Sequence, residues 1–135
     1  MKNLKRIAIV IALVPCFLVG LVVAYIAFEI FGMCVNHIST GMQTRKLEQN
    51  LTDAISDIKI LDSYSETGNT SGTGNHVDSL SVVTFSSGKS LEEIHSSMAE
   101  YYEFSDWYCH IRETDAGFEF YLCTSAPFRD NIEGH

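Results

Sequence analysis

Residues 7–28 contain no charged side chain, and this run constrains the fold more than any other feature of the sequence. Ile, Val, Leu, Ala and Phe dominate it. A helix that crosses about 30 Å of hydrocarbon needs roughly 20 apolar residues, and this run supplies them. The sequence therefore predicts a transmembrane signal-anchor helix over residues 7–35, preceded by a basic stub over residues 1–6. The whole chain has 135 residues, which leaves room for one small domain beyond the anchor.

A cleavable signal peptide is the alternative, because it also places basic residues before an apolar core. Such cores have about 7–15 residues, whereas this run continues past the small-residue cleavage context at residues 22–24. We therefore expect an uncleaved anchor. Basic residues crowd the N-terminal stub, while the nearest ones on the other side are Arg45 and Lys46. This bias places the N-terminus in the cytoplasm and the rest of the chain outside the cell membrane.

Small residues recur at every fourth position of the predicted span: Ala8, Ala12, Cys16, Gly20 and Ala24. Such spacing lets a second helix approach closely, so this face predicts self-association or a partner helix within the bilayer. Chance is the alternative interpretation, because Gly and Ala are frequent in membrane helices. Glu29 is expected at the outer interface, where a charge costs less than at the bilayer centre.

Residues 36–62 are predicted to form an amphipathic stalk helix. Its apolar residues follow alternating steps of four and three: Leu47, Leu51, Ala54, Ile58 and Leu61. This short heptad seam either pairs with a second copy of the chain or packs the helix on the terminal domain. Residues 63–76 are rich in Gly, Ser, Thr and Asn, which predicts a flexible linker. Asn50 and Asn69 each begin an N-glycosylation sequence.

Residues 77–135 are predicted to form an extracytoplasmic α+β domain. Ser90 and Glu93 form a capping box, which starts a helix. Three segments have the β-branched or alternating composition of strands: residues 80–85, 107–113 and 118–124. The expected fold is therefore β-α-β-β, with one helix on a three-stranded sheet.

Cys109 and Cys123 lie on the two strands of the predicted hairpin, in a compartment that favours disulfides. A three-residue turn would set the two cysteines opposite each other. A two- or four-residue turn would leave Cys109 on the apolar face and would point Cys123 to the other face, because a one-residue slip exchanges the faces. The sequence supports the two registers equally.

The predicted topology also brings several polar residues to one pole of the domain. If the first two strands are parallel, both begin at the end of the sheet where the third strand finishes. The residues that would gather there suit zinc or His/Asp acid–base chemistry: His76, Asp78, Asp106, Asp130, Glu133 and His135. Four of these residues are the candidate metal ligands: His76, Asp78, Glu133 and His135. The alternative is a solvated chain end, because termini often fray.

The charge balance limits the classes of partner. From Asn36 onward the chain has six basic and 16 acidic residues, a formal charge of −10. Such a surface repels the phosphates of nucleic acids and anionic lipids, so we expect no nucleic-acid partner. The sequence also lacks a G-x-S-x-G nucleophile motif, and we expect no enzymatic activity. Trp107 and Tyr108 are candidates for a partner-binding patch.

The order of basic start, apolar helix, amphipathic continuation and terminal sheet resembles a pilin-like layout. The sequence lacks that family's processing signature, a glycine cleavage point followed closely by a glutamate within the apolar stretch, and no family is assigned. The leading hypothesis is a single-pass cell-envelope protein, without a cofactor, whose acidic domain binds another protein as part of a membrane assembly. The alternatives are a small metal-dependent hydrolytic module at His76 and His135, and a membrane-embedded regulator or sensor that acts through its helix.

Overall fold

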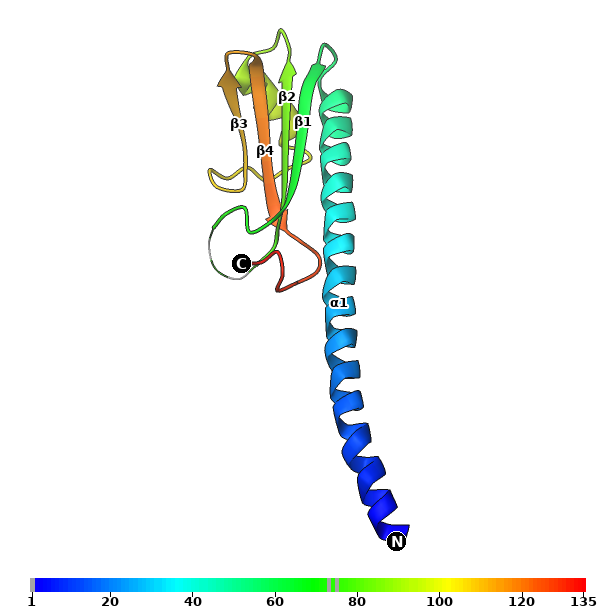
Figure 1. Ribbon diagram of the computed structural model, residues 1–135. Helices are drawn as coiled ribbons and strands as arrows, with labels where there is room; N and C mark the ends of the chain where they lie inside the picture. The colour runs from blue at the N-terminus through cyan, green and yellow to red at the C-terminus, as the bar shows by residue number, and fades with distance from the viewer. Residues whose placement is uncertain (1, 73, 75) are drawn as a thin grey trace.

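The computed structural model describes residues 2–72, 74 and 76–135. One long helix is followed by a four-stranded antiparallel sheet and a short helix (Figure 1). The strand order is β1-β2-β4-β3. The elements along the chain are α1 (Lys2–Ala54), β1 (Lys59–Gly68), β2 (Asp78–Ser86), α2 (Leu91–Met98), β3 (Cys109–Thr114) and β4 (Gly117–Ser125).

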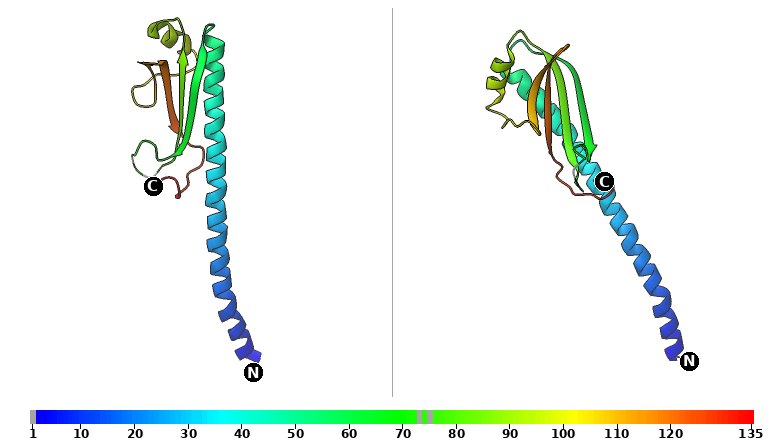
Figure 2. Two further views of the ribbon diagram at one scale, coloured as in Figure 1. Left: turned by 45° about the horizontal axis from the view of Figure 1, so that its top comes forward. Right: turned by 90° about the vertical axis from the view of Figure 1, so that its left-hand side faces the viewer.

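Helix α1 is continuous, and its two halves have different surroundings. The N-terminal half projects away from the domain, whereas the C-terminal half lies along the sheet (Figures 1 and 2). Every side chain from Ile11 to Phe28 is exposed. This half is long and apolar enough to cross a membrane, and a signal sequence would have the same character. The exposed half is therefore compatible with a single-pass anchor or a signal.

The C-terminal half of α1 buries one stripe of residues at steps of three and four, as expected for one face of a helix. Its members are Gly32, Asn36, Thr40, Thr44, Leu47 and Leu51, and Ile55 continues it directly after the helix. The stripe is polar or small as far as Thr44 and apolar from Leu47 onward. Leu47 and Leu51 are part of the core of the same chain and Ala54 packs against it, so the part of the predicted seam that lies in α1 packs the helix on its own domain.

The sheet has four strands rather than the three predicted. Helix α1 ends at Ala54, before the predicted end of the stalk, and residues 59–68 form β1. Six of these residues, 63–68, fall in the predicted linker. Strand β1 is polar because it lies at the edge of the sheet, with most of its side chains exposed. Its hydrogen bonds to β2, rather than apolar burial, make it a strand, which is why its composition resembles that of a linker.

The core lies between the sheet and the two helices, which cover the same face of it (Figure 2). Ile94 and Met98 of α2 meet Phe85 and Phe120 of the sheet, together with the apolar stripe of α1. The predicted order β-α-β-β is confirmed for β2, α2, β3 and β4. Helix α2 begins at the predicted capping box, in which Ser90 and Glu93 each accept a hydrogen bond from the other's backbone N–H.

The register of the β3–β4 hairpin decides between the two predicted arrangements of the cysteines. Thr114 pairs with Gly117, so the turn has two residues and Cys109 pairs with Leu122. Cys109 lies in the core, while Cys123 points to the other face, 3.9 Å from Thr70 Oγ1. Both are buried free thiols, so of the two arrangements that the sequence left open, the structure has the one without a Cys109–Cys123 disulfide. This register places the apolar residues of the hairpin on one face, in the core. The other register would have set the two cysteines opposite each other.

Gly117 provides a test of the hairpin. Its φ is +132°, and a Cβ would lie 2.5 Å from the carbonyl oxygen of Phe85 on β2. We expect Gly117→Ala to lower the free energy of unfolding by about 2 kcal/mol, because the conformation and the neighbouring strand both exclude a side chain. The control is Gly41→Ala in α1, where the added Cβ meets open space and should stabilise by about 0.5–1 kcal/mol. Denaturant midpoints of the detergent-solubilised chain measure both, and equal midpoints would contradict the prediction.

The buried cysteines provide a second test. Burial raises the pKa of the Cys109 thiol from 9.0 to about 11. Because the thiolate is the reactive form, Cys109 should react with a maleimide at pH 8 about a hundredfold more slowly in the folded chain than in the unfolded chain. The exposed Cys34 is the internal control and should react readily in both states. Mass spectrometry of labelled peptides measures the rates, and a Cys109–Cys123 disulfide would leave both residues unlabelled after unfolding without reductant.

Candidate functional site

The C-terminal tail, residues 126–135, returns to α1 and docks just beyond its exposed apolar half (Figure 1). We call this contact the helix–tail junction. It joins segments that are 92 to 102 positions apart in the sequence. Its residues are Glu29, Gly32, Asn36 and His37 of α1 and Phe128, Asp130, Asn131 and Glu133 of the tail.

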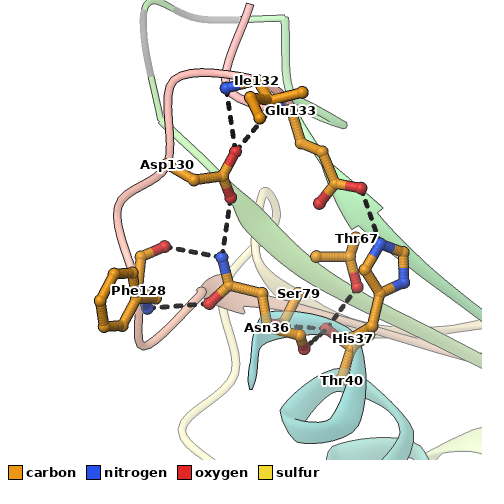
Figure 3. Close-up of polar contacts among 9 residues, drawn as sticks. All are labelled: Asn36, His37, Thr40, Thr67, Ser79, Phe128, Asp130, Ile132 and Glu133. Atoms are coloured by element: carbon orange, nitrogen blue, oxygen red, sulfur yellow. Dashed lines mark hydrogen bonds and ion pairs between the residues drawn. The ribbon is translucent and has the colours of Figure 1, made fainter. Parts of the chain in front are cut away.

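Asn36 is the centre of the junction and is fully buried (Figure 3). Its Nδ2 donates to the carbonyl oxygen of Phe128 at 2.7 Å and to Asp130 Oδ2 at 3.0 Å. Its Oδ1 accepts from the Phe128 N–H at 2.8 Å. Asp130 Oδ1 in turn accepts from the N–H groups of Ile132 and Glu133, which folds the tail into a turn. The amide thus binds the tail backbone on both sides, in one defined geometry.

Glu29 closes the end of the junction that lies nearest the exposed apolar half of α1. Its side chain is only 4% exposed, although it follows a long apolar run. One carboxylate oxygen accepts from the Asn131 N–H at 2.7 Å, and the other accepts from Asn131 Nδ2 at 3.1 Å. The same Nδ2 donates to the Tyr25 hydroxyl at 3.0 Å. The tail therefore supplies the hydrogen bonds that a carboxylate at this position needs.

The ring of Phe128 packs on α1 where the helix has no side chain. A Cβ added at Gly32 would collide with this ring, so the close approach depends on the glycine. The ring also makes edge contacts with Phe28 at 5.1 Å and with Phe31 at 6.2 Å between centroids. Apolar and polar contacts therefore hold the same short stretch of tail.

Hydroxyl groups join α1 to the sheet immediately beyond the junction. Thr40 Oγ1 donates to Ser79 Oγ at 2.9 Å and accepts from Thr67 Oγ1 at 2.8 Å (Figure 3). Thr44 and Ser81 share a further hydrogen bond of 2.7 Å. Because these buried hydroxyls pair in matched positions, they specify how the sheet sits on the helix.

The four predicted metal ligands do not come together. His76 Nε2 lies 2.9 Å from Asp78 Oδ1, but Glu133 Oε1 lies 2.7 Å from Nε2 of His37 on α1 (Figure 3). His135 is exposed at the chain end. Asp78 does lie beside the end of β4, as the predicted topology required, yet the tail then continues to α1. Within residues 2–72, 74 and 76–135, no group of three or more His, Cys, Asp or Glu side chains is placed to hold a metal ion.

The other predicted binding residues are exposed. Trp107 is 82% exposed and Tyr108 is 60% exposed, and both directly precede the edge strand β3. On α1 the small residues Ala12, Cys16, Gly20 and Ala24 are exposed, and nothing lies within 4 Å of a Cβ added at Gly20. The side chain of Ala8 lies outside the part of the chain whose side chains are described.

Sequence reasoning missed the helix–tail junction, because its partners carry no motif and lie far apart in the chain. Asn36 and Asp130 are ordinary polar residues 94 positions apart. One signal was available: Glu29 ends an apolar run, and such a carboxylate needs hydrogen-bond donors from elsewhere.

Comparisons of the chain with models of protein families, with curated proteins and with solved structures found no match. The chain is therefore described by its own fold and by the helix–tail junction. The chain is a small α+β domain whose own first helix extends into an exposed apolar segment, and whose C-terminal tail binds that helix where the two halves meet.

Asn36→Ala tests the junction. The change removes three hydrogen bonds and leaves the Phe128 backbone and the Asp130 carboxylate without these partners. We expect the Phe128 N–H to exchange with solvent at least about tenfold faster, because each unpaired buried group costs about 1–3 kcal/mol. Hydrogen exchange measured by NMR follows this amide.

Two further variants sharpen that experiment. Gly32→Ala should speed exchange in the same way without removing a polar group, because its Cβ would displace the Phe128 ring. Ile38→Ala, at an exposed position of the same helix, should leave exchange unchanged. Unaltered protection of Phe128 in both junction variants would show that the tail is held by other contacts.

Proposed function

We propose that the chain is a single-pass membrane protein that presents its acidic domain to a protein partner outside the membrane, as a subunit of a membrane assembly. The observation that carries this proposal is the continuity of α1, which is both the exposed apolar segment and part of the domain core. A flexible linker would leave the orientation of a domain free. A domain built on the anchor helix itself has a constant height and direction.

Polar residues flank the apolar half of α1 on both sides, which supports a defined depth of this helix in the bilayer. Basic residues occupy the stub before residue 7, and Glu29 with its hydrogen-bonded tail follows on the other side. The intervening 22 residues would span about 33 Å as a helix, close to the thickness of the hydrocarbon layer. The helix–tail junction would then lie at the outer surface of the membrane, with the sheet beyond it.

A binding role has more support than a catalytic one. Trp107 and Tyr108 are large, exposed aromatic residues beside an edge strand, and aromatic side chains are common anchors of protein interfaces. The polar side chains that converge at the junction bond to one another, so they serve the fold. We therefore propose neither an enzymatic activity nor a cofactor.

A second contact is proposed within the bilayer. The exposed small residues of α1 form a face on which another helix could pack closely, and a Cβ added at Gly20 would meet nothing within 4 Å. This face supports self-association or pairing with a partner helix, alongside recognition by the outer domain.

Site-specific photo-crosslinking in native membranes tests the proposed partner surface. A benzophenone amino acid in place of Trp107 should crosslink one specific protein, because this position is the most exposed aromatic site of the domain. The matched control is the same replacement at Tyr64, which is 51% exposed on the opposite edge strand. Trp107→Ala should lower co-purification of that protein about tenfold, whereas Tyr64→Ala should leave it unchanged. Identical products from both positions, or none, would contradict the proposal.

A further inference from the structure

An open groove of about 900 Å³ runs between α1 and the sheet on the side of β4. One wall is the face of α1 from Ser39 to Asn50, at which residues recur at steps of three and four. The opposite wall contains Tyr101 and Tyr102, which follow α2, and Leu122 of β4 also lines the groove. The volume lies in the upper part of the range found for ligand sites, about 300–1,000 Å³.

Hydrogen bonds order the lining before any ligand binds. Gln43 Nε2 donates to the carbonyl oxygen of Ser79 at 2.9 Å, and its Oε1 accepts from Thr124 Oγ1 at 2.5 Å. Asn50 Nδ2 donates to the Tyr102 hydroxyl at 2.9 Å, which links the two walls. Burial raises the pKa of that hydroxyl above its ordinary value, which is itself well above neutral pH. The groove is therefore a preformed feature of the surface, and binding would cost little further ordering.

The groove carries positive charge on an acidic domain. Arg45 and Lys46 are two of the six basic residues from Asn36 onward, a part of the chain that has a formal charge of −10. Neither of them forms an ion pair with another described residue. None of the described residues that line the groove is acidic. The charge of the groove is thus opposite to that of the domain and complementary to an anionic ligand.

Position and length favour a peptide over a lipid. Lys46 lies 17 positions beyond Glu29, about 25 Å along the helix, which exceeds the screening length of about 8–10 Å for lipid headgroup charges. The wall from Ser39 to Asn50 is about 16 Å long, which matches about five residues of an extended chain. Two tyrosines and Leu122 add apolar contacts that a peptide with alternating side chains can use.

We infer that this groove binds an extended, acidic segment of the partner protein, with carboxylates on Arg45 and Lys46 and apolar side chains against Tyr101 and Leu122. The inference rests on the proposed function and names the chemistry of the partner. Leu122 pairs with Cys109, two residues after Trp107, so the groove and the exposed aromatic residues belong to the same end of β3. One partner chain could contact both.

The test uses the full chain in phosphatidylcholine nanodiscs and two pools of octapeptides. One pool has Glu or Asp at alternate positions with mixed residues between, and the other has Gln or Asn at those positions. We expect the acidic pool to be retained at least about fivefold better than the amide pool, and Arg45→Glu/Lys46→Glu to lower retention about tenfold. Arg45→Gln/Lys46→Gln should give an intermediate loss, because it removes the attraction without adding repulsion.

Lys59→Glu/Arg129→Glu is the matched control, because it changes the net charge equally at exposed positions outside the groove. It should keep the retention of the acidic pool within about twofold. Equal retention of the two pools, or equal losses in the two charge-reversal variants, would overturn the inference. Displacement of the peptides by phosphatidylglycerol vesicles would overturn it in favour of a lipid ligand.

Photo-crosslinking separates this inference from the proposed function. If the protein captured at position 107 is still captured at full yield in the Arg45→Glu/Lys46→Glu variant, the partner surface stands and the groove is not its binding site. If capture at position 107 fails while the acidic pool still binds in the groove, the groove inference stands and the aromatic surface does not.

Discussion

The continuity of α1 is the constraint on which the rest of the structure depends. The N-terminal half of this helix is apolar and exposed. The C-terminal half of the same helix buries one stripe of its side chains in the domain. The change occurs between Glu29 and Asn36, where the tail covers the helix. The tail supplies hydrogen-bond partners for the buried side chains of Glu29 and Asn36, so these polar groups are satisfied where the surroundings of the helix change.

The apolar and polar parts of the buried stripe of α1 have different effects on stability and on packing geometry. Leu47, Leu51 and Ile55 bury apolar surface, and each fully buried side chain of this kind contributes about 1.5–3 kcal/mol. Asn36, Thr40 and Thr44 form hydrogen bonds whose net contribution is about 1 kcal/mol each, but whose geometry is specific. The apolar part therefore stabilises the domain, whereas the polar part determines how the sheet and the tail sit on the helix. An apolar stripe alone would allow the sheet to slide along the helix.

The proposed role follows from this division. A domain whose orientation is set by its own anchor can present a surface at a constant distance from the bilayer. Leu122 of the basic groove pairs with Cys109, which directly follows the exposed aromatic residues Trp107 and Tyr108. The remaining surface is acidic and would repel most cellular polyanions. The two surfaces together would give selectivity for a partner that combines carboxylates with apolar side chains.

The sequence by itself determined the elements whose signals are local. The apolar run, the capping box at Ser90 and the alternating hairpin strands each follow from neighbouring residues, and each is present in the structure. Tertiary structure decided the edge strand β1, the register that separates Cys109 from Cys123, and the helix–tail junction. The reason is physical: a polar edge strand is held by hydrogen bonds to its neighbour, a register depends on the packing of a whole face, and Asn36 meets Asp130 only after the chain has folded back over the intervening residues. The position of Glu133 was decided in the same way, because its carboxylate lies 2.7 Å from His37 on a helix that the local pattern could not place beside it.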